Sequence, residues 1–167
     1  MIPPRIKLGQ KWNIQLSSVL HNYRDYGHTP NTIMGYKIPD FQRPLVWTLE
    51  QKIKLIESLY LGYDIGTFTI NENADIPEID NILIDGMQRL FAIQEYITDK
   101  FEVFGSLYSE LDFKYPDKRY RARFSSSSIG QYVLDSDDIQ FLKQHYNRLN
   151  FSGTAHKEED RAWLIGF

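Results

Sequence analysis

The sequence predicts a single α+β domain in which a small mixed sheet has helices packed around it. Segments with helical spacing of apolar residues alternate with short β-rich segments, and no internal repeat or linker interrupts them. A length of 167 residues is typical of one domain. With 42% hydrophobic residues, including 11 Tyr and 10 Phe, the chain has enough apolar material for a core of its own.

The first half of the chain predicts two helices around a structured loop. Apolar residues follow helical spacing over 14–26, and Thr48 with Gln51 forms a capping-box pattern at the start of a helix over 48–61. The segment 36–47 begins as a brief strand, but its two prolines cannot donate to a sheet, so the rest is expected to be a loop.

The second half predicts a strand–turn–helix unit followed by more mixed structure. The expected strands are 65–73, 81–85, 101–105 and 129–135, and the expected helices are 87–98, 137–149 and a last one from Thr154. The basic stretch 111–128 ends in a serine run and is expected to be a mobile loop.

Composition excludes several classes of protein. The chain contains no cysteine, which removes disulfides, thiolate nucleophiles and zinc ribbons, and its four histidines have no metal-ligand spacing. A net charge of −3 argues against a non-specific DNA-coating protein. No run of 18 apolar residues and no secretory signal is present, so a cytoplasmic protein without a membrane partner is expected.

The run Asp85-Gly86-Met87-Gln88-Arg89 lies where a strand should end and a helix should begin. Gly86 allows a sharp turn, and the first helix amides lack intrahelical acceptors, so this joint can bind an anion. Gln88 and Arg89 add side-chain donors for a nucleotide phosphate, and Asp85 could orient Mg²⁺ or water. For the run taken alone, a helix cap with a surface ion pair is the favoured interpretation.

A second Gln-Arg pair strengthens the interpretation as a phosphate site. Gln42 and Arg43 lie in the proline-bracketed loop, where the backbone is stiff and independent of a sheet, so both pairs could converge on one anion. The alternative is a buried loop in which Arg43 extends into solvent.

Two further segments are candidates for binding. Asn150 precedes a turn formed by Ser152, Gly153 and Thr154, whose amides and hydroxyls could hold another phosphate; for this turn taken alone, helix capping is the favoured explanation. A basic cluster interleaved with aromatic residues could contact nucleic acid, although a solvated helix face is the simpler explanation. Its members are Lys118, Arg119, Arg121 and Arg123.

Taken in order, three of these blocks resemble the N-terminal (GmrS-like) domain of the GmrSD family, a branch of the ParB/sulfiredoxin-like superfamily. The blocks are YKIPDFQRPLVWTLEQKIKLIESLYLGYDIGTFTI, LIDGMQRLFAIQEYI and YNRLNFSGTAHKEED, and they extend along Tyr36 to Arg161, about three quarters of the chain. The resemblance implies a ParB-like domain over 36–167, preceded by an N-terminal helix and lead-in over 1–35, within one compact unit.

The resemblance implies nucleotide binding at the turn between strand and helix. The family usually shows Asp-Gly-Gln-Gln-Arg there, so Asp85, Gly86, Gln88 and Arg89 carry over, whereas Met87 replaces the first glutamine. Family members act in restriction of modified or phage DNA with a His-Asn-His-type nuclease half. That half is not in this sequence, so the expectation is either a separate effector or nuclease partner or a stand-alone, phage-borne version, in a bacterial or phage-infected cell.

Three functions remain open at this point. The first is a nucleotide-dependent enzyme that hydrolyses an NTP or transfers its phosphate to a hydroxyl, with Asp85, Arg43 and Arg89 as catalytic residues and Mg²⁺ as cofactor. The second is a weakly catalytic or non-catalytic sensor of nucleotide or DNA that recruits a partner. The third is a nuclease acting through the core, which would need further metal-binding carboxylates. Candidates are Asp75, Glu78 and Asp80.

Overall fold

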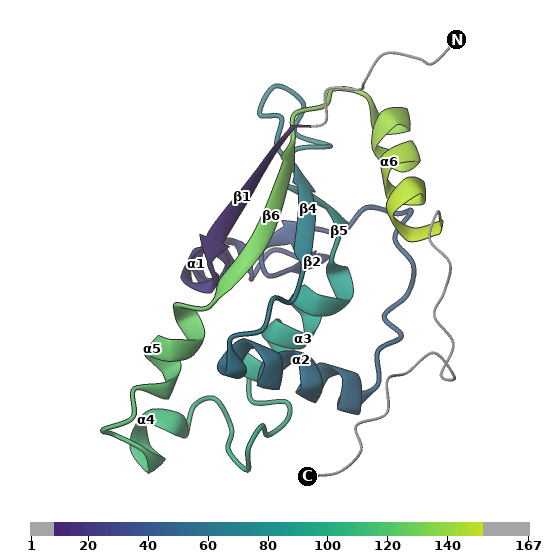
Figure 1. Cartoon of the computed structure of the whole chain (residues 1–167). Coiled ribbons are helices and arrows are strands. Elements are labelled where there is room, and N and C mark those ends of the chain that lie inside the picture. The colour runs from purple at the N-terminus through teal and green to yellow at the C-terminus, as the bar shows by residue number, and fades with distance from the viewer. Residues whose placement is uncertain (1–8, 152–167) are drawn as a thin grey trace.

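A computed structural model describes residues 9–151, which form one six-stranded mixed sheet with helices against it (Figure 1). The strands are β1 (Gln10–Gln15), β2 (Thr32–Ile33), β3 (Tyr36–Lys37), β4 (Thr67–Asn71), β5 (Ile82–Asp85) and β6 (Ser128–Leu134). The helices are α1 (Leu16–Tyr26), α2 (Leu49–Leu61), α3 (Met87–Ile97), α4 (Leu111–Lys114), α5 (Tyr120–Ser125) and α6 (Ile139–Phe151). The predicted α+β class is therefore confirmed.

The sheet has the strand order β1-β6-β4-β5-β3-β2. The pairs β6/β4 and β5/β3 are parallel, and the other three neighbouring pairs are antiparallel. Strand β5 therefore lies inside the sheet, between β4 and β3, and its carboxyl end leads directly into α3.

Successive side chains of β5 point to opposite faces of the sheet, so this strand contributes to both hydrophobic clusters. Leu83 belongs to the larger cluster, which includes buried residues of α1, α2 and α3. Ile82 and Ile84 point to the opposite face, where they pack with Leu142 and Tyr146 of α6. Because β5 is covered on both faces, the residues at its carboxyl end are held by two layers of helices.

Helix α2 starts and ends as its sequence predicts. The hydroxyl of Thr48 accepts a hydrogen bond from the Gln51 amide, and the Gln51 side chain accepts one from the Thr48 amide at 2.8 Å. Gly62 ends the helix in the left-handed region at φ 84°.

Two expectations for the middle of the chain are wrong. The segment 101–105 is not a strand, because only the isolated bridge between Val103 and Ser106 forms there. The stretch 111–128, expected as a loop, contains α4 and α5, and Phe124 of α5 is fully buried in the larger core. The aromatic residues between its basic positions form packing contacts, so this stretch is anchored to the domain.

The start of the described chain also differs from expectation. Residues expected to open a helix at 14 instead end β1, and α1 begins at Leu16. The helix expected from Thr154 lies outside the described residues. Among the residues that are described, no helix combines the length and apolar character needed to cross a lipid bilayer.

Asn71 connects two loops at the end of the sheet opposite α3. Its side chain is fully buried, donates to the carbonyls of Ile79 and Ser136 at 2.9 and 3.1 Å, and accepts from the Ser136 amide at 2.9 Å. The side chain thus satisfies three backbone groups that no sheet pairing reaches.

We expect Asn71→Ala to lower the free energy of unfolding by about 2–4 kcal/mol, because it leaves buried backbone groups without partners. Chemical denaturation measures this change. The control is Asn13→Ala on exposed β1, which should cost about 0.5 kcal/mol or less. Equal losses in both variants would contradict the role given to Asn71.

Candidate functional site

The turn between β5 and α3 has room only for glycine. Gly86 has φ 92°, and a Cβ atom placed on it would lie 2.5 Å from the Cβ of Phe68, a fully buried residue of β4. Because of this close approach, the first turn of α3 begins directly beside β4 and the carboxyl end of β5.

Three backbone amides at the start of α3 have no acceptor within the helix. The first helical hydrogen bond runs from the Leu90 amide to the Gly86 carbonyl at 3.0 Å, so the amides of Met87, Gln88 and Arg89 precede it. Together with the helix dipole, these amides favour an anion at this end of α3.

Arg89 reaches back over this turn toward the sheet. Its Nη2 atom donates to the Thr67 carbonyl and to Asp85 Oδ2, the latter at 3.3 Å, and the ion pair with Asp85 is partly buried. Its Nε atom is buried and has no hydrogen-bond partner among the described residues. A buried guanidinium N–H without an acceptor is costly, so an anion that accepts from it would stabilise the site.

Gln88 is already engaged with the protein. Its side-chain oxygen accepts from the amides of Val46 and Trp47 at 3.1 and 3.2 Å, and its Nε2 atom donates to the Pro44 carbonyl at 3.0 Å. The side chain therefore holds the proline-bracketed loop against α3. Any contact it makes to a phosphate would come from its backbone amide.

The same loop is tied to the sheet through Gln42. Its Nε2 atom donates to the carbonyls of Leu83 and Ile84 at 2.8 and 3.0 Å. The next residue, Arg43, donates its backbone amide to the hydroxyl of Tyr146 on α6 at 3.1 Å, while its side chain is exposed. Arg43 thus has a fixed backbone and a side chain that is able to move.

These segments enclose a small cavity of about 60 Å³. Seven of the predicted site residues line it together with Trp47 and Met87: Gln42, Arg43, Asp85, Gly86, Gln88, Arg89 and Asn150. Small-molecule pockets are usually about 300–1,000 Å³, so this cavity has room for a phosphate-sized group and not for a whole nucleotide. A nucleoside attached to that group would extend over the surface.

The remaining predicted phosphate contacts follow Asn150 in the sequence, and the basic cluster lies elsewhere in the fold. Ser152, Gly153 and Thr154 are outside the described residues, and Asn150 uses its Nδ2 atom to donate to the Tyr146 carbonyl at 3.0 Å. The basic cluster is on and beside α5, away from α6 (Figure 1). Of its members, Arg121 pairs with Asp112 at 3.1 Å and lies 4.7 Å from the Tyr108 ring centroid.

A histidine that the sequence did not single out lies beside the candidate site. The ring of His145 on α6 is stacked on Tyr132, 6.5 Å between centroids, and packs near Phe141. Burial lowers the pKa of His145, and the negative charge of Asp85 acts in the opposite direction. A lone histidine on a helix gives no sequence signal for this proximity, which only the fold creates.

A magnesium ion in this cavity would bind to the protein through one carboxylate. Within residues 9–151, Asp85 is the only acidic residue lining the cavity, and no three His, Asp or Glu side chains are grouped so that they could hold a metal. Mg²⁺ commonly binds through one or two carboxylates plus substrate phosphates, so Asp85 fits an ion that arrives with a nucleotide and not a permanent metal centre.

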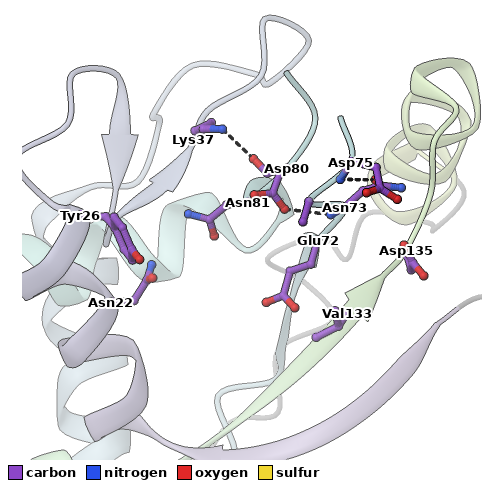
Figure 2. A pocket seen from close by; sticks show the side chains of 11 residues that line it. Asn22, Tyr26, Lys37, Glu72, Asn73, Asp75, Asp80, Asn81, Val133 and Asp135 are labelled. Atoms are coloured by element: carbon purple, nitrogen blue, oxygen red, sulfur yellow. Dashed lines mark hydrogen bonds between the residues drawn. The ribbon is translucent and has the colours of Figure 1, made fainter. Parts of the chain in front are cut away.

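Acidic residues gather instead around an open cleft of about 810 Å³ at the other end of β5 (Figure 2). Figure 2 shows the carboxylates of Glu72, Asp75, Asp80 and Asp135 around this cleft. Asp80 accepts from the Asn73 amide at 2.8 Å, which is a loop contact. The nuclease interpretation needs a group of metal-binding carboxylates, and it gains no support in the described part of the chain.

Together, the fold and the site define an α+β domain with a glycine turn before α3 and, at the start of that helix, amides that have no acceptor within it. The model of the family described as GmrSD restriction endonuclease, N-terminal domain, matches residues 17–163. The chain therefore belongs to this family, which associates it with restriction-type DNA systems. Neither the comparison with curated proteins nor the comparison with solved structures gives a match.

We expect Asp85→Asn to lower the pKa of His145 further, because the substitution removes the charge that favours the protonated ring while burial continues to oppose protonation. NMR titration of the histidine resonances measures the shift. A buried histidine with a lowered pKa binds a proton less readily than the unfolded chain does, so its contribution to stability falls as the pH drops below the usual histidine range.

The control for this titration is Asp112→Asn, which removes a carboxylate of α4, far from α6 (Figure 1). It should leave the titration of His145 unchanged. A rise in the His145 pKa in Asp85→Asn would show that the carboxylate does not act through its charge.

Proposed function

We propose that this domain binds the phosphates of a nucleotide at the turn between β5 and α3 and performs phosphoryl-transfer chemistry in a restriction-type DNA system. The observation that carries the proposal is the buried Nε of Arg89, which has no acceptor among the described residues. Arg89 lines one cavity with Met87 and Gln88, and the amides of these three residues precede the first hydrogen bond of α3. A phosphate group supplies several strong acceptor oxygens to such donors.

The residues of the site have different roles in binding the phosphate. Gly86 lets the phosphate approach the backbone, and Arg89 with the amides of α3 holds it. Gln42 and Gln88 keep the loop in place through their bonds to backbone groups. Asn150 lines the same cavity, and Ser152, Gly153 and Thr154 follow it in sequence as further candidate phosphate contacts.

Two side chains would act on the reacting group itself. Arg43, exposed at the cavity, would stabilise the negative charge that develops on the transferred phosphoryl group. Asp85 would hold Mg²⁺ or orient the attacking oxygen. That oxygen belongs to water in an NTP hydrolase and to a substrate hydroxyl, for example on DNA, in a transferase; Mg²⁺ would neutralise phosphate charge in either reaction.

A second candidate function is a sensor that binds nucleotide or DNA with little or no catalysis and recruits a separate effector or nuclease protein. Two observations favour it. Asp85 is already paired with Arg89, and Met87, buried at 6% exposure, places an apolar side chain where the family usually has glutamine. Both reduce the number of polar groups available for chemistry.

The first experiment measures nucleotide binding as the rise in Tm on adding each NTP with Mg²⁺. We expect the rise to shrink in Arg43→Gln and Arg89→Lys. Arg43→Gln is the cleaner variant, because only the backbone of Arg43 contributes to the described contacts. Arg89→Lys retains the charge but cannot reproduce the Nε donor. The control is Arg24→Gln, an exposed arginine of α1.

A second measurement separates the functions. Phosphate release that falls in both variants indicates hydrolysis, labelled phosphate on DNA indicates transfer, and binding without either supports the sensor. Nucleotide binding that is equal in the wild type, Arg43→Gln and Arg89→Lys would refute the proposed phosphate site.

A further inference from the structure

A second cavity lies at the opposite end of α3 from the candidate site. It has a volume of about 280 Å³ and lies where the C-terminal ends of α2 and α3 meet the segment from Val103 to Arg123. Most of its lining is apolar or aromatic: Tyr60, Leu61, Tyr96, Val103, Phe104, Leu111, Tyr115 and Tyr120. This size and lining are close to those of small-ligand pockets.

Several aromatic rings that line this cavity contact one another edge-on. Tyr60 contacts Phe104 edge-on at 6.3 Å, and Tyr115 contacts Tyr120 edge-on at 5.4 Å, both between ring centroids. Phe104 is 62% exposed and has a positive φ of 51°, so an aromatic ring is presented to solvent at the cavity. Such a site offers a flat ring several surfaces on which to stack.

The cavity also contains polar groups with unused capacity. Ser106 lines it and is 1% exposed, yet its hydroxyl has no hydrogen-bond partner among the described residues. The hydroxyls of Tyr60 and Tyr96 are 3.0 Å apart, so one donates to the other and the second keeps a hydrogen to donate. Burial raises the pKa of both tyrosines, which keeps them neutral.

Positive charge is concentrated beside this cavity, in a protein whose net charge is −3. Five of the 19 lysines and arginines fall between positions 114 and 123. Lys114 and Arg121 are engaged with acidic side chains. The other three are exposed and have no side-chain partner in the described structure, and Asp117 is the one acidic residue between positions 114 and 123. They are Lys118, Arg119 and Arg123, of which Arg123 lines the cavity.

We propose that this cavity is a second binding site, which takes a flat heteroaromatic ring carrying a phosphate, the chemistry of a nucleotide unit. The ring stacks among the tyrosines and Phe104, and polar edges of the ring satisfy Ser106 and the tyrosine hydroxyl pair. The attached phosphate lies against Arg123 and the neighbouring cations. This site is independent of the phosphate role proposed for Arg89.

Two sources supply this chemistry: a free mononucleotide, or a nucleotide of a single strand whose base is unstacked. The probes are therefore dAMP and dTMP in one arm and short single-stranded oligonucleotides of dA and dT in the other. Affinity is measured by calorimetry at low and moderate salt. Backbone amide shifts at Phe104 and Ser106 on titration locate the binding.

The informative variant is Ser106→Ala. It removes a buried hydroxyl that has no partner, so it should leave the Tm unchanged or raise it, while it weakens binding by about fivefold, the value of one hydrogen bond. Arg123→Gln should weaken binding and reduce its salt dependence. Arg24→Gln is the matched charge control, and Arg89→Lys should leave this binding unchanged.

Loss of affinity in Ser106→Ala and Arg123→Gln, with Arg24→Gln and Arg89→Lys unaffected, would support the site. If dAMP or dTMP binds with these variant effects, the ligand is a free nucleotide. If only the oligonucleotides bind with these effects, the ligand is a nucleotide within a single strand. No binding of either probe, or binding that both pocket variants leave unchanged, would overturn the proposal.

Discussion

Where β5 gives way to α3, the backbone of Gly86 passes so close to Phe68 that no side chain fits between them. This contact sets the distance between the start of α3 and strand β4, and it is the reason that Arg89 can reach the Thr67 carbonyl on that strand. The same contact directs the free amides of α3 toward the carboxyl end of β5, beside Asp85. The packing of the core and the geometry of the candidate site therefore depend on the same contact, because Phe68 belongs to the larger hydrophobic cluster. A change at Gly86 would alter both at once.

The two proposed binding regions lie at opposite ends of one helix. At its N-terminus, α3 offers backbone donors and Arg89 to a small, polar cavity. At its C-terminus, Tyr96 belongs to an aromatic cluster that contacts α2 and α5. The first environment selects for negative charge in a confined space, whereas the second selects for flat apolar surface with charge at its edge. An α-helix of 11 residues is about 16 Å long, so ligands at the two ends would not touch but would share a rigid element.

Local signals predicted the elements that local chemistry determines. The Thr48–Gln51 capping box, the apolar period of α2 and the glycine between β5 and α3 are all visible in the sequence and are all present. Strand β1 was missed because its alternating pattern is short, with Trp12 and Ile14 as its apolar positions, and because its residues are mostly exposed. Pairing with β6 makes it a strand. That the two Gln-Arg pairs could share one site was predictable from the proline-bracketed loop and the glycine turn, and both pairs line the same cavity. The use of Gln88 was not, since nothing local indicates that the loop returns to α3.

The loop over the candidate site is attached by carboxamide side chains, with Gln42 bonded to β5 and Gln88 bonded to the loop backbone. Carboxamides do not titrate and carry no net charge, so neither acid nor added salt weakens these bonds as it weakens an ion pair. Added salt screens the charges of Arg89 and Asp85, and acid protonates nearby His145. Ionic strength and pH will thus change how strongly an anion is attracted to the cavity, while the shape of the cavity stays the same. The affinity for the anion and the structure of the loop therefore depend on different side chains of one small site.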